Sequence, residues 1–369
     1  MITLSDVLHQ RAAQAKIPLS GVFELSPVCN FACKMCYVRK TPAQLRAEGK
    51  QLLTCRDWLA MAEQCRSAGT LSLLLTGGEP FLYPDFRELY TTLHRMGFLL
   101  SVNTNGTLID ADTLLWLKQY APARINLTLY GASRATYGRI CGDENGFDRA
   151  IAALEGLKNA GIPTVINASM IPENAEDLEA IFAIGRRLDL NVRMGTYMFP
   201  PVRRDREAGD SRFTPEQGAE IYLRKERCQR SPEDYRTWLK GCIARETTPP
   251  TPDEDWGNAP EFMRCRAGRS SFWISWEGIM TACGLMDFPL KTAPFERGFL
   301  PCWQELTDRV RSSTVLSGCA GCPKRDICVP CAAMIHTETG DPQGPAPYLC
   351  ESAEHILSRM RREEKEMAL

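Results

Sequence analysis

Between residues 21 and 198, short apolar runs alternate with longer amphipathic stretches. The short runs have the length of buried strands, and the longer stretches have helical spacing of their apolar residues. The pattern predicts strands at Gly21–Ser26, Leu71–Thr76, Leu99–Asn103, Ile125–Tyr130, Pro163–Met170 and Val192–Met198. It predicts helices at Arg56–Ala68, Phe86–Met96, Thr113–Tyr120, Phe147–Ala160 and Asn174–Leu188.

Several of these helices carry recognisable end signals. Asp85 and Asp110 stand where N-caps are expected, and Gly69, Gly97 and Gly161 stand where helices should end. Strand–helix alternation predicts a parallel sheet with right-handed crossovers.

With Pro215–Cys228 as the last helix, six such units predict an α/β fold, a partial (β/α)6 TIM-like barrel. Functional groups are then expected on the loops that leave the carboxyl ends of the strands.

The chain has 369 residues, which favours two domains. Prolines and charges interrupt the pattern at Pro200–Asp210 and Thr247–Pro260, and Glu246–Asn258 is interpreted as a linker or long loop. The predicted division is an N-terminal extension (1–20), the barrel (21–205), its last helix with the linker (206–260) and a cysteine-rich domain (261–369).

Composition excludes some classes of function. The formal net charge of -1 gives no basic field for nucleic acid, and no apolar run is long enough to cross a bilayer. The first 16 residues lack the apolar core of a signal peptide, so a cytoplasmic protein is expected. The 16 cysteines are clustered, which favours metal binding over disulfides.

The first cysteine cluster is Cys29-x-x-x-Cys33-x-x-Cys36, directly after the first predicted strand. Three thiolates on one tight loop can hold three irons of a cubane cluster and leave the fourth iron open to a substrate. By this triplet alone, three buried free thiols or a partial zinc site remain alternatives.

The next two strands also end in candidate ligand-binding residues. Gly77 and Gly78 would let the backbone approach a ligand closely, and the carboxylate of Glu79 can accept hydrogen bonds from an ammonium group. Asn103 and Asn105 place amide side chains after the third strand. Simple turns would explain both segments as well.

Together, the C-x-x-x-C-x-x-C loop and the Gly77-Gly-Glu-Pro80 loop resemble the signature of the radical SAM superfamily. The resemblance implies that Cys29, Cys33 and Cys36 ligate a 4Fe–4S cluster whose open iron is chelated by S-adenosylmethionine (SAM). Reductive cleavage of SAM would then give a 5′-deoxyadenosyl radical.

The resemblance also implies a set of SAM contacts. The segment Gly77–Glu79 would line the methionyl amine, and Tyr37 would contribute through its backbone. Met35 stands where the family usually has an aromatic residue against adenine. Further expected SAM contacts are Thr128, Arg139, Asn167 and Ser169, for which surface or capping roles are the plain alternatives.

Cys141 follows the fourth strand and is considered as a hydrogen-atom donor to a substrate radical, against the alternative of a small buried residue.

A second cysteine array lies near the C-terminus. Its spacing alone fits a structural zinc site, but beside the first signature it is similar to a SPASM domain with two auxiliary 4Fe–4S clusters. The resemblance assigns Cys319, Cys322, Cys328 and Cys350 to an outer cluster, and Cys265, Cys283 and Cys331 to an inner cluster. Cys242 is a candidate fourth inner ligand; otherwise the inner cluster would be open.

SPASM-type enzymes mostly act on peptides, so the resemblance implies a maturase that forms a thioether or carbon–carbon crosslink in a ribosomally made peptide. Its expected partners are the peptide, a flavodoxin or ferredoxin reductant and, because the extension before the first strand is short, a separate leader-peptide recognition protein.

Alternative functions are sulfatase maturation by formylglycine formation, peptide epimerisation and dehydrogenation of a small molecule. Formylglycine formation is ranked lower because Gly284 replaces the Asp expected after Cys283. The non-enzyme alternative is an electron-transfer or zinc-stabilised scaffold protein.

Overall fold

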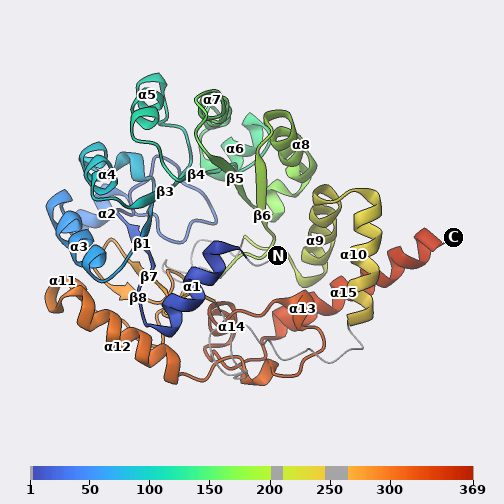
Figure 1. Ribbon diagram of the computed structural model, residues 1–369. Coiled ribbons are helices and arrows are strands. Elements are labelled where there is room, and N and C mark those ends of the chain that lie inside the picture. The colour runs from blue at the N-terminus through green and yellow to red at the C-terminus, as the bar shows by residue number, and fades with distance from the viewer. Residues whose placement is uncertain (1–2, 201–210, 246–264, 369) are drawn as a thin grey trace.

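The computed structural model describes residues 3–200, 211–245 and 265–368. In this part of the chain, one eight-stranded sheet has the order β6-β5-β4-β3-β2-β1-β7-β8. Pairing is parallel from β6 to β7, and β8 is antiparallel to β7. Figure 1 shows the sheet curving, with α3, α4, α5, α7 and α8 on its outer side. The predicted α/β partial barrel is confirmed.

The elements follow one another as the alternation predicts. The strands are β1 (Ser20–Glu24), β2 (Ser72–Thr76), β3 (Leu99–Thr104), β4 (Arg124–Thr128), β5 (Thr164–Ser169), β6 (Asn191–Gly195), β7 (Ser271–Ile274) and β8 (Met280–Thr281). The helices of the barrel region are α1 (Leu4–Gln14), α2 (Pro42–Ala47), α3 (Cys55–Ser67), α4 (Phe86–Arg95), α5 (Ala111–Gln119), α6 (Arg134–Cys141), α7 (Gly146–Asn159), α8 (Leu178–Leu188) and α9 (Pro215–Gln229). The remaining helices are α10 (Pro232–Arg245), α11 (Pro294–Arg297), α12 (Phe299–Ser312), α13 (Arg325–Cys328), α14 (Ala332–Thr339) and α15 (Pro347–Ala368).

All six predicted strands are present, whereas β7 and β8 were not predicted. The four residues of β7 pair with β8 on one side and with β1 on the other, where Gly21 lies opposite Phe272. A Cβ on Gly21 would lie 2.2 Å from the ring of Phe272, so only glycine leaves room for that ring. The cysteine-rich region therefore enters the same sheet as the barrel.

The predicted helix ends are partly correct. Asp110 caps α5 by accepting the Thr113 N–H at 2.8 Å. Asp85 is the N-cap residue of α4, as predicted, but it has a left-handed conformation, with a φ of 59°, and its side chain makes no capping hydrogen bond. Gly69, Gly97 and Gly161 all have positive φ, as expected where helices end.

Helices α1, α2, α6, α10 and α11 to α15 were not predicted. The helix expected at Asn174–Leu188 begins later, at Leu178. A 3-10 turn over Pro172–Asp177 occupies the earlier residues because Pro172 fixes the chain there.

The two faces of the sheet differ in polarity. Phe23, Leu75, Val102 and Ile125 are fully buried on the outer face, against the helices. The inner face is polar toward the carboxyl ends of the strands, with Glu24, Thr76, Asn103, Asn126, Thr128, Asn167 and Ser169. A polar lumen at this end of the barrel is where the fold places binding groups.

The C-terminal helix α15 packs along α9 and α10 and ends far from the sheet, as Figure 1 shows. The predicted linker at Glu246–Asn258 and most of the break at Pro200–Asp210 lie outside the described residues. No helix in the described ranges combines the length and the hydropathy needed to span a bilayer.

Candidate functional site

The first three cysteines lie on one loop at the carboxyl end of β1. The sulfur of Cys29 accepts the Phe31 N–H at 3.4 Å, and the sulfur of Cys36 accepts the Arg39 N–H at 3.2 Å. The charges of Cys33 and Cys36 both act on Cys29, so the three thiols share one electrostatic environment. Backbone N–H groups that point at sulfur stabilise thiolates.

This trio has the donors of an iron–sulfur cluster. Burial raises the pKa of Cys29 to about 12, so the thiolate form needs a cationic partner. Three cysteine thiolates on one loop can ligate three irons of a 4Fe–4S cluster.

The glycine loop after β2 packs directly on the cysteine loop. The Gly78 N–H donates to the Ser26 carbonyl at 2.6 Å, and the Glu79 N–H donates to the Val28 carbonyl at 2.9 Å. A Cβ on Gly77 would lie 2.4 Å from the Ser26 oxygen, and one on Gly78 would lie 2.3 Å from the Val28 oxygen. These two glycines are therefore required by the contact between the two loops.

Glu79 is completely buried and joins the loops after β2 and β3. Its carboxylate accepts hydrogen bonds from the Thr104 hydroxyl at 2.7 Å, the Asn105 N–H at 2.8 Å and the Phe81 N–H at 3.2 Å. Burial raises the pKa of Glu79 to about 7, against the lowering effect of these bonds. Glu79 was expected to bind the SAM ammonium group, but most of the hydrogen bonds that its carboxylate can accept are already made within the chain.

A polar network surrounds Cys29. The Asn105 side-chain nitrogen lies 3.8 Å from the Cys29 sulfur and donates to the Asn30 amide oxygen at 2.9 Å. Thr107 donates to the Asn105 amide oxygen and accepts from Asn30 at 2.8 Å. Sequence reasoning missed Asn30 and Thr107, because ordinary polar residues in turns give no local signal.

Cys141 lies against the cysteine loop. The Ala32 N–H donates to the Cys141 carbonyl at 2.9 Å, which docks the end of α6 on this loop. The thiols of Cys141 and Cys33 are hydrogen-bonded, which lowers the pKa of Cys33 and raises that of Cys141. The Tyr130 hydroxyl also bonds Cys33. At 1% exposure, Cys141 has the position of a packing neighbour of a candidate ligand.

The other expected SAM contacts are dispersed over the loop ends. The Arg139 guanidinium donates to the Glu173 carbonyl at 2.7 Å and 3.2 Å, which ties α6 to the turn before α8. Thr128 and Asn167 are paired neighbours on the inner face of β4 and β5, and Ser169 continues the same row. The side-chain oxygen of Asn103 accepts from Asn126 at 2.8 Å.

Met35 and Tyr37 are half-buried on the cysteine loop. Met35 packs against the main hydrophobic core, and Tyr37 packs against the small cluster that contains Trp276.

The C-terminal cysteines fall into two groups. Cys265, Cys283 and Cys331 act on one another electrostatically, although Cys331 is close in sequence to the other group. The thiols of the second group likewise interact with one another: Cys319, Cys322, Cys328 and Cys350. The chain thus assembles the same two sets that the SPASM resemblance implies.

Cys242 is not brought to the inner group. It is buried in α10, where it packs with Leu239 and Met360, and the Arg245 guanidinium contacts its sulfur at 3.4 Å. Its candidate role as the fourth inner ligand therefore has no support from its position.

An acid and a histidine follow the inner cysteines. Asp287, four residues after Cys283, lies 3.6 Å from the His336 Nε2 and 3.2 Å from the Lys291 Nζ. Within the described ranges, the His336 Nδ1 is buried and has no hydrogen-bond partner. The sequence gave no sign that Asp287 and His336 would lie together.

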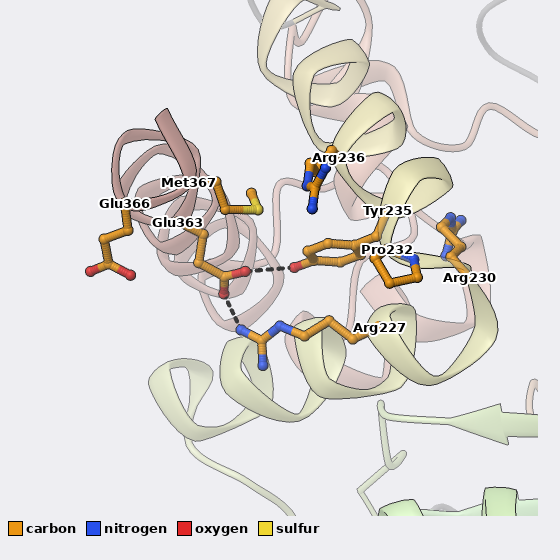
Figure 2. A pocket seen from close by; sticks show the side chains of 8 residues that line it. All are labelled: Arg227, Arg230, Pro232, Tyr235, Arg236, Glu363, Glu366 and Met367. Atoms are coloured by element: carbon orange, nitrogen blue, oxygen red, sulfur yellow. Dashed lines mark hydrogen bonds and ion pairs between the residues drawn. The ribbon is translucent and has the colours of Figure 1, made fainter. Parts of the chain in front are cut away.

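A pocket of about 450 Å³ lies away from the cysteine loops, between α9, α10 and the end of α15. Figure 2 shows Glu363 at its wall, where the Arg227 guanidinium and the Tyr235 hydroxyl both reach its carboxylate. These bonds join three helices, so the pocket marks a structural junction.

Comparisons with known proteins agree with the cysteine loop. Residues 23–183 match the family model of the Radical SAM superfamily. An AdoMet-dependent heme synthase from Methanosarcina barkeri is 24% identical over 349 residues, which cover 91% of this chain and 97% of that protein. A PqqA peptide cyclase from Ruegeria pomeroyi is 31% identical over 178 residues, which cover 48% of this chain and 45% of that protein.

The fold also has a solved counterpart. The structure of Streptococcus suis SuiB bound to its precursor peptide SuiA aligns with a TM-score of 0.67 at 19% identity. The alignment covers 94% of this chain and 79% of SuiB. At this identity the likeness shows a shared fold, which extends beyond the barrel into the C-terminal region.

The family match implies SAM and one 4Fe–4S cluster, and the thiol trio at Cys29, Cys33 and Cys36 has the donors that such a cluster needs. With the matched barrel, the cysteine loop and the glycine loop in place, residues 23–183 of this enzyme form a radical SAM domain.

Proposed function

We propose that the enzyme modifies a peptide, as a maturase that forms a thioether or carbon–carbon crosslink. The observation that carries the proposal is the gathering of three separate thiol groups in one chain, one on the barrel loop and two in the C-terminal region. The PqqA cyclase relative acts on a peptide by its name, and SuiB binds one in its structure, which supports this substrate class.

The residues of the first site have distinct roles in the proposal. Cys29, Cys33 and Cys36 hold the cluster, and the Asn105 amide donates toward the Cys29 sulfur. When bound, the cluster and SAM supply a 5′-deoxyadenosyl radical that takes a hydrogen atom from a substrate carbon. The rings of Phe31 and Tyr130, whose centroids are 5.9 Å apart, shield this loop from water on one side.

Loss of a hydrogen atom and an electron from the substrate also leaves a proton to be accepted. His336 fits this task because Asp287 orients its Nε2 while its Nδ1 has no partner among the described residues. We assign the proton-accepting role to His336 and the positioning role to Asp287.

The two C-terminal thiol groups are proposed to hold auxiliary 4Fe–4S clusters. Cys319, Cys322, Cys328 and Cys350 supply a complete outer set. Cys265, Cys283 and Cys331 supply three inner ligands, so the proposed inner cluster has one open iron. A flavodoxin or ferredoxin reductant and a separate leader-peptide recognition protein complete the proposal as partners.

Two of the alternative peptide reactions are less favoured. A Cβ at Gly284 would lie 2.5 Å from the Trp273 ring, so the Asp associated with formylglycine formation has no room there. Epimerisation through Cys141 is less favoured because that thiol is buried against Cys33.

A second candidate function is a step of heme synthesis, with a tetrapyrrole as the substrate. The heme synthase from Methanosarcina barkeri favours it, because that relative matches this chain over nearly its whole length. The peptide cyclase matches only about half of each chain, although at higher identity.

The test begins with anaerobically reconstituted protein, SAM and dithionite, where formation of 5′-deoxyadenosine is expected. The next step is incubation with the peptides encoded beside the gene. A crosslinked product, lighter by two hydrogen atoms, supports the maturase, and a Cys33→Ala variant should give neither product. Zinc in place of iron at the first site, or conversion of an added tetrapyrrole with no peptide product, would contradict it.

A further inference from the structure

The inner face of β4 carries polar atoms that the described chain leaves without partners. Asn126 is only 5% exposed, yet its side-chain oxygen has no hydrogen-bond partner among the described residues. Two residues earlier on the same face, the Nε of Arg124 is likewise buried and without a partner. Buried polar atoms without partners are costly, so a sheet face that retains them is suited to a ligand that completes them.

A second cation lies on the same face of the sheet. In the sheet register, Thr128 pairs with Asn167, and Asn167 pairs with Arg193 on β6. Arg193 is exposed, as are its inner-face neighbours Asn191 and Gly195, so this part of the lumen is open to solvent.

The two arginines repel each other. Burial and the positive charge of Arg193 both lower the pKa of Arg124. Glu24 is the acid on this face, but it lies on β1, separated from β4 by β2 and β3. An anion bound between the arginines would relieve this repulsion.

We propose that the inner face of β4–β6 binds a carboxylate of the substrate, held by Arg124 and Arg193, while the Asn126 oxygen accepts an adjacent N–H. A carboxylate next to an amide N–H is the chemistry of an acidic residue in a peptide. The inference rests on the proposed function and narrows it to peptides with Asp or Glu near the modified residue.

Isothermal titration of the anaerobically reconstituted holoenzyme with SAM tests this site without requiring turnover. The probes are N-acetyl-glutamate and its neutral counterpart N-acetyl-glutamine, both used as their α-N-methylamides so that only the side-chain carboxylate differs, and butyrate, which has a carboxylate but no amide. We expect N-acetyl-glutamate to bind about tenfold more tightly than either of the others, because only it satisfies both the arginines and Asn126.

Variants separate the groups involved. Arg193→Gln is at an exposed position and should fold, and it should remove the preference for N-acetyl-glutamate over N-acetyl-glutamine. Asn126→Asp keeps the shape but adds a negative charge, which should weaken binding of every carboxylate probe. Arg187→Gln, an exposed arginine on α8 that pairs with Glu155, is the matched control and should leave the preference unchanged.

Equal binding of the charged and neutral probes, or equal effects of Arg193→Gln and Arg187→Gln, would overturn the proposal. Weaker SAM binding in Arg193→Gln would also overturn it, because the site would then hold the carboxylate of SAM itself. Equal affinity for butyrate and N-acetyl-glutamate would exclude the amide contact and the peptide assignment. Failure to find a crosslinked peptide, by contrast, would contradict the proposed maturase function but would not change the measured affinities for these probes.

Discussion

The side-chain nitrogen of Asn105 lies 3.8 Å from the sulfur of Cys29, although the two residues are 76 positions apart. The contact exists because the loops after β1 and β3 meet at one end of the sheet. The same amide is fixed by Asn30 and Thr107, so it keeps its orientation toward the sulfur.

This contact predicts a redox effect. Donors to a cluster thiolate stabilise the reduced, more negative state and raise its potential. Asn105→Leu should therefore lower the potential of the SAM-binding cluster, by on the order of 50 mV. A titration followed by electron paramagnetic resonance would measure it, with the auxiliary clusters as an internal control. An unchanged potential would show that the Asn105 amide does not act on the cluster.

The buried Glu79 predicts a pH-dependent stability. Its pKa rises from 4.5 to about 7 on burial, so between these values the folded chain holds a proton that the unfolded chain has released. This group therefore costs stability as pH rises through that window, by about 3 kcal/mol once pH exceeds 7. Glu79→Gln cannot ionise and should lack this decline in thermal unfolding.

Glu277→Gln, at an exposed turn, is the control for Glu79→Gln and should follow the wild-type profile. Parallel profiles for Glu79→Gln and wild type between pH 4.5 and 7 would contradict the assigned ionisation.

The contact between the glycine loop and the cysteine loop predicts that a side chain at Gly77 will prevent binding of the first 4Fe–4S cluster. Gly77 and Gly161 both have positive φ, but only at Gly77 would a Cβ meet backbone, 2.4 Å from the Ser26 oxygen. Gly77→Ala should push the glycine loop off the cysteine loop and reduce iron bound after reconstitution by about one cluster. Gly161→Ala, with nothing near its Cβ, should cost only about 1 kcal/mol of stability. Equal iron contents in the two variants would rule out the loop contact as the cause.

Because the outer C-terminal thiols are separate from the first thiol trio, loss of the outer cluster should not prevent SAM cleavage. Cys350→Ala should lower iron by about one cluster's four atoms while 5′-deoxyadenosine formation continues, because the first thiol trio is untouched. Cys33→Ala should lower iron by a similar amount and abolish that product. A Cys350→Ala protein that keeps its full iron content would argue against an outer cluster.

The junction shown in Figure 2 predicts a contribution to stability. Glu363 is bonded by the Arg227 guanidinium and by the Tyr235 hydroxyl at 2.7 Å, which links α15 to α9 and α10. Glu363→Ala should lower the free energy of unfolding by about 1–2 kcal/mol. Glu366→Ala, which lines the same pocket at an exposed position, should change it little in the same denaturant titration.

Local sequence determined most of the barrel and the first ligand set. The six strands follow from short apolar runs, and Cys29, Cys33 and Cys36 lie close together because eight residues of one loop hold them. Asp110 was a correct N-cap because capping depends only on residues three positions away.

Tertiary structure decided the rest, since contacts between the ends of parallel strands leave no periodic trace in the sequence. Pairing with β1 and β8 made a strand of Ser271–Ile274, and packing of two loops explains Gly77 beside Ser26. The placement of Cys141 beside Cys33 and of Cys242 away from the inner thiols depends on how helices dock on the sheet. The sequence shows which side chains are candidates for a site, whereas the packing of helices and loops on the sheet decides which of them come into contact.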